Sequence, residues 1–232
     1  MLAVVGSPSF APGSTPDAAG EAGGLAAGIA RAAAAEGAEV QLVGKVGDDP
    51  SGDAVLLALG RERVGHLALL RDAGHPTPIA PLGVAAADSS DMEAIATLVG
   101  DDASTDEPPD GLGAAAPPVG LAMEAADISL GLRYVRDFRV LVAADPLDGP
   151  SSLVIAEAAT FADAVLIVVA PHGQATPGAP ASAIVLEAPE TDPDGAFAML
   201  VGRLAAALDR GVDVGQAFRS AATQGGWERA GS

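Results

Sequence analysis

Short apolar runs separated by turns rich in glycine and proline predict an alternation of strands and helices. The run Leu2–Val5 ends at Gly6, which is typical of a buried first strand. An alanine-rich stretch, 24–36, stops at Gly37 and predicts a helix with a glycine just beyond its end. The later predicted strands are 39–43, 67–70, 77–87, 128–132, 140–144, 165–169 and 183–186, and the later helices are 51–63, 152–161, 195–209 and 214–223.

Strand, helix, strand and helix in this order predict right-handed parallel β-α-β units. We therefore expect an α/β layered sandwich with helices on both faces of the sheet, built as one domain over residues 1–232 without internal repeats. Ser51 is the expected cap of the second helix. The segment 44–50 is expected to be a polar turn in which Lys45 lies beside Asp48 and Asp49. The acidic stretch 101–118 is expected to be a mobile loop.

Charge and composition exclude several classes of function. The chain has 12 lysines and arginines against 31 aspartates and glutamates, a formal net charge of −19, and Lys45 is its only lysine. Binding to nucleic acid or to an anionic membrane needs clustered positive charge, so neither is expected. The chain has no cysteine, which excludes disulfides, thiolate nucleophiles and cysteine-ligated metals. Aromatic residues make up 3%, too few for base-stacking platforms.

Neither a targeting signal nor a membrane span is expected. The first basic residue is Arg31, so no charged segment precedes an apolar stretch at the N-terminus. No apolar run approaches the roughly 18 residues that a membrane span needs. These features predict a cytoplasmic protein.

An ordered set of motifs before residue 80 resembles the N-terminal half of the ribokinase-like (PfkB) carbohydrate kinase family. The motifs are Val5-Gly6, Gly23-Gly24 opening a helix, Gly37-Ala38, the run 42–49 with Gly52, Leu59, Val64-Gly65 and Pro76-Thr77-Pro78. A weaker likeness continues through 126–128, 163–167 and the last two helices. The resemblance implies a ribokinase-like three-layer α/β/α sandwich with a small β lid over the sugar.

The same resemblance implies ATP-dependent phosphoryl transfer to a hydroxyl of a sugar or nucleoside. In that chemistry a helix N-terminus holds the transferring phosphate, Mg²⁺ neutralises charge and an aspartate takes the hydroxyl proton. ATP and Mg²⁺ are therefore the cofactors that an active protein would need. Gly23 and Gly24 are the candidate substrate-binding residues. Close helix packing is the alternative role for both glycines.

The sugar-binding positions of the family are substituted in this chain. Ser7, Pro8 and Ser9 occupy the positions of the family's Asn-x-Asp arrangement, and Gly28 occupies that of a family asparagine. The segment between Gly6 and Gly23 is shorter than the family uses for its first lid strands. We therefore expect a reduced lid formed by 77–87.

The catalytic motif is also altered. The family sequence Asp-Thr-x-Gly-Ala-Gly-Asp-Ala-Phe corresponds here to 190–197, with one residue lost. Asp194 is the candidate catalytic base, but it stands two residues before Ala196 rather than one. That change turns a side chain by about 100° and moves it about 1.5 Å along a helix. Gly195 and Ala196 are the candidate nucleotide-binding residues. In the alternative interpretation, Asp192 is the N-cap of the last long helix, and Pro193 and Asp194 lie in its first turn.

Neither the family's Asn-x-x-Glu motif nor its Thr-x-Gly turn is present before this segment. Asp145 and Asp148 follow a strand end, where α/β proteins often place functional carboxylates, although a simple turn fits them equally well.

Two further features bear on ligands and partners. The three histidines, His66, His75 and His172, are far apart in sequence, so no metal site is expected. Trp227 is expected to cover the last helices or to anchor a subunit contact.

Three functional hypotheses follow. The first is a degenerate member of the family, a pseudokinase, that binds or regulates with weak or no phosphoryl transfer. The second is an active kinase for a sugar or nucleoside that uses Asp194, ATP and Mg²⁺. The third is a structural or subunit-interaction protein. A lid surface freed of its usual strands is in addition a candidate edge for a homodimer.

Overall fold

A parallel six-stranded sheet in the order β5-β4-β1-β6-β7-β8 forms the centre of the computed structural model. The structure describes residues 1–13, 20–80, 121–174, 176, 178–190, 192 and 194–225. The strands of this sheet are β1 (Leu2–Val5), β4 (Val40–Gly47), β5 (Val64–Asp72), β6 (Val140–Ala143), β7 (Val165–Ala170) and β8 (Ile184–Glu187). The helices are α1 (Leu25–Ala35), α2 (Pro50–Arg61), α4 (Ala125–Leu132), α5 (Gly149–Phe161), α6 (Ala196–Asp209) and α7 (Val214–Gly225). Within these described ranges, no helix is both long and apolar enough to cross a lipid bilayer.

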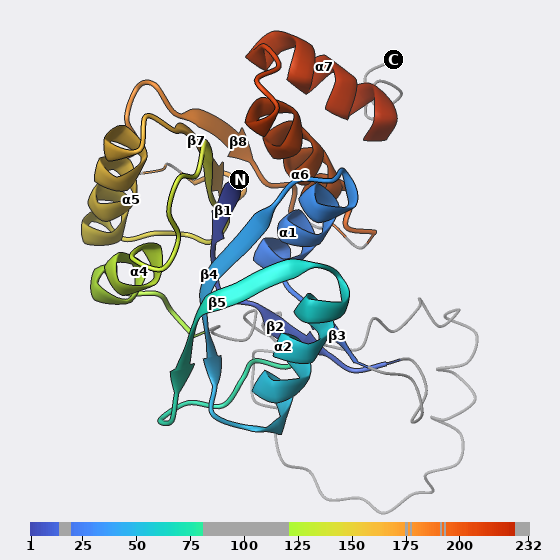
Figure 1. Ribbon diagram of the computed structural model, residues 1–232, viewed down its shortest axis with the longest axis vertical. Helices are drawn as coiled ribbons and strands as arrows, with labels where there is room; N and C mark the ends of the chain where they lie inside the picture. Colours follow the sequence, from blue (N-terminus) through green and yellow to red (C-terminus); the bar gives the residue numbers. More distant parts are fainter. Residues whose placement is uncertain are drawn as a thin grey trace, which may run out of the picture.

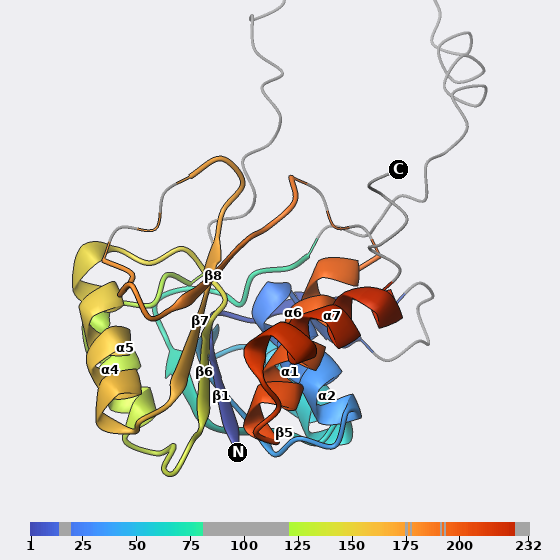
Figure 2. The ribbon, with the colours of Figure 1, turned by 90° about the horizontal axis from the view of Figure 1, so that it is seen from above.

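Helices cover both faces of the sheet, as Figures 1 and 2 show. Successive side chains of a strand point to opposite faces. On β1, Val4 packs into the cluster that includes α1, α2, α6 and α7, and Val5 packs into the cluster that includes α4 and α5. Both valines are almost completely buried. The predicted α/β sandwich with helices on both faces is confirmed.

Small residues bring α1 and α6 into close contact. A Cβ atom at Gly202 would lie 2.6 Å from the Ala32 Cβ, and one at Gly28 would lie 3.0 Å from the Ala198 Cβ. Real carbon atoms do not pack at 2.6 Å, so Gly202 is required for this helix crossing. Gly28, at the position of a family asparagine, lies in the same helix contact.

The predicted strand over 128–132 is wrong, because these residues belong to helix α4. A short apolar run does not by itself distinguish a buried strand from a buried helix segment. The distinguishing signal lies just before the run, where the Glu124 amide donates a hydrogen bond to the Asp127 side chain at 3.2 Å. This bond satisfies one free amide at the helix start and favours a helix.

The predicted polar turn over 44–50 is also wrong in its first half. Residues 44–47 continue β4, and their pairing with β5 extends to Gly47 opposite Asp72. The cap of α2 is Asp49 rather than Ser51, because the Asp49 side chain accepts a hydrogen bond from the Gly52 amide at 2.7 Å.

Lys45 lies elsewhere than predicted. As part of β4, its ammonium group pairs with Asp127 and lies 3.9 Å from Asp72. It therefore does not lie beside Asp48 and Asp49.

The lid differs from the prediction as well. Two short strands, β2 (Ser9–Ala11) and β3 (Glu21–Gly23), form an antiparallel pair, so the segment after Gly6 is long enough to build them. Ile79 adds a bridge to Phe10, and the Phe10 amide donates to the Pro78 carbonyl at 2.7 Å. The prediction that 77–87 alone forms the lid is therefore wrong. Residues 81–87, the acidic stretch 101–118 and Trp227 lie outside the described residues.

Candidate functional site

The order of the strands creates a crevice between β1 and β6. The chain runs from β1 outward to β4 and β5, and then returns to β6 on the other side of β1. Neighbouring connections therefore leave the carboxyl ends of β1 and β6 in opposite directions, which is where ligands bind in open α/β sheets. Ser7 follows β1 and Asp145 follows β6.

Asp145 is held at this crevice by the backbone of the neighbouring strand. The Ser7 amide donates a hydrogen bond to Asp145 Oδ2 at 2.5 Å. The close approach depends on Gly6, where a Cβ atom would lie 3.0 Å from the Asp145 Cγ and 2.7 Å from the Ala26 Cβ. Burial raises the pKa of Asp145 to about 6, and the Ser7 hydrogen bond opposes that rise. Asp145 therefore carries an acidic group that titrates near neutral pH.

A cavity of about 710 Å³ opens next to Asp145, and the lid, which comprises β2, β3 and residues 77–80, contributes Ser9, Pro78 and Ala80 to its lining. Its walls come from the end of β1, the start of α1, the segments 78–80 and 121–124, and the residues that follow β6. Its polar or charged lining residues are Ser7, Ser9, Glu124, Asp145 and Asp148. We call this cavity the cleft.

The two candidate substrate-binding glycines are placed differently. Gly24 lines the cleft and precedes α1 with φ of 88°, a conformation that favours glycine. Gly23 ends β3, where a Cβ atom would lie 2.8 Å from the Ser9 Oγ. Gly23 therefore permits close contact between the two lid strands, and Gly24 contributes a wall of the cleft.

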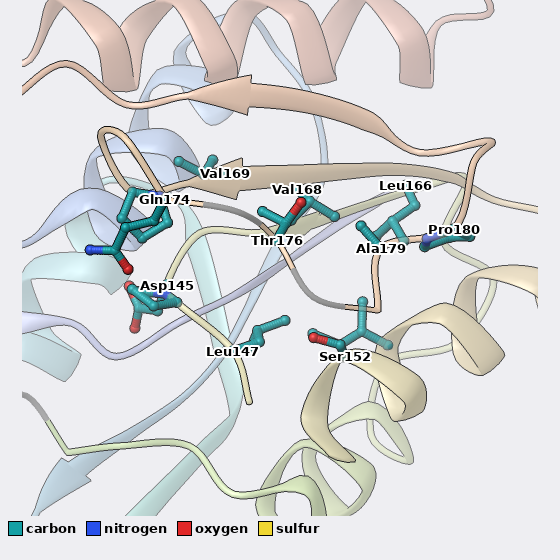
Figure 3. A pocket seen from close by; sticks show the side chains of 13 residues that line it. Asp145, Leu147, Ser152, Leu166, Val168, Val169, Gln174, Thr176, Ala179 and Pro180 are labelled. Carbon is teal, nitrogen blue, oxygen red and sulfur yellow. The ribbon is translucent and has the colours of Figure 1, made fainter. Parts of the chain in front are cut away.

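A second, smaller cavity of about 190 Å³ adjoins the cleft, with which it shares Asp145, Pro146 and Leu147. It lies between α5, the ends of β6 and β7, and the segment that leads from β7 to β8. Figure 3 shows Asp145 and Gln174 at one end of this cavity and Leu166, Ala179 and Pro180 towards the other. We call it the side cavity.

The two carboxylates after β6 have different roles in the structure. Asp148 accepts a hydrogen bond from the Ser151 amide at 2.8 Å and caps α5. Its hydrogen bonds with Ser151 lower the pKa of Asp148 below the ordinary value. Of the two, Asp145 is the carboxylate that the structure holds between both cavities.

Two motifs of the sequence bind each other at the edge of the lid. Thr77 donates its amide and its hydroxyl to Asp49, at 2.7 and 2.8 Å, and the Gly47 amide donates to the Thr77 hydroxyl at 2.9 Å. The hydrogen bonds that Asp49 accepts from the Gly52 amide and from Thr77 lower the pKa of Asp49. The run around Gly47 and the Pro76-Thr77-Pro78 motif therefore fasten the lid segment to α2.

The start of α6 already holds a carboxylate. Asp192 accepts hydrogen bonds from the Phe197 amide at 3.1 Å and from the Ala198 amide at 3.3 Å. Gly195, with φ of 65°, occupies the N-cap position that we had predicted for Asp192. The prediction that Asp192 is the N-cap is therefore wrong, although its side chain, three residues farther back, accepts hydrogen bonds from amides of the first turn. Pro193 lies outside the described residues.

The candidate catalytic and nucleotide-binding residues lie at the same helix start. Asp194 is exposed and precedes α6. The alternative interpretation, which placed Asp194 in the first turn of this helix, is therefore wrong for this residue. Gly195 and Ala196 follow it at the beginning of the helix. None of these three residues is among the described residues that line the cleft or the side cavity.

Comparisons with known proteins find a family pattern in part of the chain and the same fold in solved structures. Residues 15–101 match the model of the pfkB family carbohydrate kinase. No curated protein sequence matches the chain. Among solved structures, ribokinase from Arabidopsis thaliana in complex with ribose and ATP is 16% identical, with a TM-score of 0.61 over 97% of this chain and 90% of that one. A PfkB protein from Polaromonas sp. JS666 is 15% identical, with a TM-score of 0.58 over 97% and 94% of the two chains.

At these identities the solved structures establish the fold, and the family match rests on residues 15–101. The expected resemblance is confirmed: the chain has the ribokinase-like fold and, over residues 15–101, the sequence pattern of the pfkB carbohydrate kinase family.

Proposed function

We propose that this chain binds a small hydroxylated molecule, of the size of a sugar or nucleoside, in the cleft, and that it transfers phosphoryl groups weakly or not at all. The proposal rests mainly on the hydrogen bonding of Asp145. Within the described part of the chain, its carboxyl group accepts one hydrogen bond, from the Ser7 amide. A carboxylate offers about four acceptor positions, so capacity remains for ligand hydroxyls. A partly buried acceptor at a strand-order reversal is well placed to orient such a ligand.

The charges around the cleft favour a neutral or cationic ligand. Asp145, Asp148 and Glu124 line it, and none of its described lining residues is lysine, arginine or histidine. The only lysine of the chain, Lys45, pairs with Asp127, which offsets its charge. Two like charges 4 Å apart repel by about 4 kcal/mol at an effective dielectric of 20. A ligand that already carries phosphate or carboxylate is therefore disfavoured.

The start of α6 supports weak or absent phosphoryl transfer. A helix N-terminus binds phosphate through free amide groups and the positive end of the helix dipole. Here Asp192 occupies the amides of Phe197 and Ala198 and adds a negative charge. ATP and Mg²⁺ are the cofactors implied by the family resemblance, and these residues as arranged do not fit a terminal phosphate. We therefore derive no phosphoryl-transfer step and propose a binding or regulatory role.

Titration of the full chain with a panel of ligands tests this proposal. D-ribose is the first probe, because a similar structure holds ribose, and other monosaccharides and nucleosides follow. We expect saturable binding of at least one hydroxylated compound and no measurable heat with ATP and Mg²⁺ in isothermal titration calorimetry. Phosphorylation of any panel member should be undetectable or far below ordinary enzymatic rates.

Two outcomes would overturn the proposal in different directions. ATP-dependent phosphorylation at an ordinary rate, abolished in Asp194→Asn, would establish the active kinase instead. Absence of binding across the whole panel would favour the structural or subunit-interaction protein. Light scattering at high protein concentration separately tests the proposed homodimer through the lid edge, which a monomer would contradict.

A further inference from the structure

The side cavity has walls of a different character from the cleft. Its inner surface is formed by Ile155 of α5 and by Leu166 and Val168 of β7, all of them buried. Leu147 and Ala179 close it from the two flanking segments. These walls offer a ligand dispersion contacts and removal of apolar surface from water, and few hydrogen bonds.

Polar groups gather at the end that the side cavity shares with the cleft. Asp145 and Gln174 both line the side cavity, and Figure 3 shows them at this end, with the hydroxyl-bearing side chains of Ser152 and Thr176 farther along. A molecule that spans both cavities would therefore meet acceptors and donors at the junction and apolar walls beyond it. This arrangement suits a hydroxyl group joined directly to an apolar group.

The volume sets the size of the apolar group. The side cavity measures about 190 Å³. An engineered apolar cavity of about 150 Å³ in another protein stays dry and binds benzene. One six-membered ring with a short linker therefore matches the available space.

We propose that the side cavity is a binding site for a compact alkyl or aryl group, so that the natural ligand is a hydroxylated molecule bearing an apolar substituent of about one ring. The hydroxylated part would occupy the cleft, and in this respect the inference rests on the proposed function. The charges further restrict the substituent. Asp145 lies at the junction and no described lysine, arginine or histidine lines either cavity, so the substituent carries no acid group.

Benzyl alcohol is the probe for this site, because it joins one ring to one hydroxyl. In methyl NMR spectra of the full chain, we expect its addition to shift the methyl signals of Leu147, Ile155 and Leu166. The signals of Leu59, which is buried on the other face of the sheet, should not move. D-ribose, titrated separately, should shift Met123 of the cleft without shifting Ile155.

Filling the cavity provides the variant test. Ala179→Leu places extra carbon atoms inside the cavity and should weaken benzyl alcohol binding at least tenfold, with ribose binding unchanged. Ala181→Leu is the matched control, because Ala181 is exposed and is not among the lining residues. Ser152→Leu is a second filling variant should Ala179→Leu fail to fold.

The possible results separate the two proposals. Benzyl alcohol that leaves the cavity methyls unshifted, or that binds folded Ala179→Leu and Ser152→Leu as tightly as the original chain, would overturn the inference while ribose binding still supported the proposed function. Shifted cavity methyls without binding of ribose or any other hydroxylated panel member would support the cavity as a site for apolar groups and contradict the proposed function.

Discussion

Two carboxylates at the ends of strands and helices show how similar groups acquire different roles. Asp192 accepts hydrogen bonds from two amides at the start of α6, so its carboxylate already has hydrogen-bond donors within the protein. Asp145 accepts one hydrogen bond, from Ser7, while burial raises its pKa to about 6. Asp192 is placed where a charged carboxylate stabilises a helix. Asp145 is placed where its charge is costly unless a ligand supplies further hydrogen bonds.

The candidate binding group is therefore identified by how few hydrogen bonds its carboxylate already accepts, more than by the presence of a carboxylate in a family motif. The family motif directs attention to 190–197. The polar groups with unused capacity lie instead at the junction of the cleft and the side cavity. Four measurements test this contrast between Asp145 and Asp192.

The largest expected effect is on stability as a function of pH. The unfolded carboxyl group ionises near 3.8, and Asp145 in the folded chain ionises near 6. Between these values the folded state holds a proton that the unfolded state has lost, so the free energy of unfolding falls as pH rises. At about 1.4 kcal/mol for each pKa unit, Asp145→Asn should be roughly 3 kcal/mol more stable than the original chain at pH 7 and nearly equal to it below pH 4.

Urea unfolding at pH 4 and pH 7 measures this difference. Asp148→Asn is the control, since hydrogen bonds lower the pKa of Asp148. Its contribution to stability is present above the unfolded pKa and is lost at lower pH, so this variant should be less stable at pH 7. An Asp145→Asn variant that is destabilised at pH 7 would show that groups within the protein already stabilise the charged carboxylate.

The second effect is on ligand binding. Asp145→Asn should weaken the binding of the hydroxylated ligand about 30-fold, because hydrogen bonds to a charged group contribute about 1.5–3 kcal/mol. Calorimetric titration of the variant and of Asp194→Asn provides the comparison. Equal losses in both variants would contradict the separation of the cleft from the start of α6.

The third effect is on the helix cap. Asp192→Ala removes the acceptor of two helix amides and should lower the free energy of unfolding by about 1–2 kcal/mol. The matched variant Asp194→Ala, at an exposed position two residues away, should stay within about 0.5 kcal/mol of the original chain. Chemical denaturation curves decide between them, and equal stability of the two variants would argue against Asp192 as the cap.

The smallest expected effect is a gain in affinity for ATP with Mg²⁺. If the Asp192 carboxylate excludes phosphate from the start of α6, Asp192→Ala should show weak binding of ATP with Mg²⁺ at nucleotide concentrations where the original chain gives no measurable heat, since charge at a helix terminus contributes about 1 kcal/mol, or roughly fivefold in affinity. Calorimetry on the folded variant at high nucleotide concentration measures the change. An unchanged affinity would mean that another feature prevents binding.

Much of the architecture could be predicted from the sequence because its signals are local. The run Leu2–Val5 and the helix ending before Gly37 are confirmed, since periodicity and a terminal glycine specify them. The error at 128–132 arose because a short apolar run fits a strand and a helix equally well. The lid was underestimated because three-residue strands leave almost no periodic signal.

The site depended on contacts that are distant in sequence. Asp145 and Asp148 both follow a strand end in the sequence, but only the position of Ser7, which is 138 residues from Asp145, distinguishes them. The side cavity was not foreseen, because its walls combine α5, β7 and the segment before β8. Likewise, the contact of Asp192 with Phe197 could not be predicted, because it depends on the turn at Gly195.

The bonds between Thr77 and Asp49 have a consequence for how tightly the cleft can bind. They fix the start of the segment that carries Pro78 and Ala80, two residues of the cleft wall, to Asp49, the N-cap of α2. An entering molecule thus meets a wall that is already in place and loses little affinity to ordering it. Preorganisation of this kind lets even a small ligand, with few contacts to offer, remain bound.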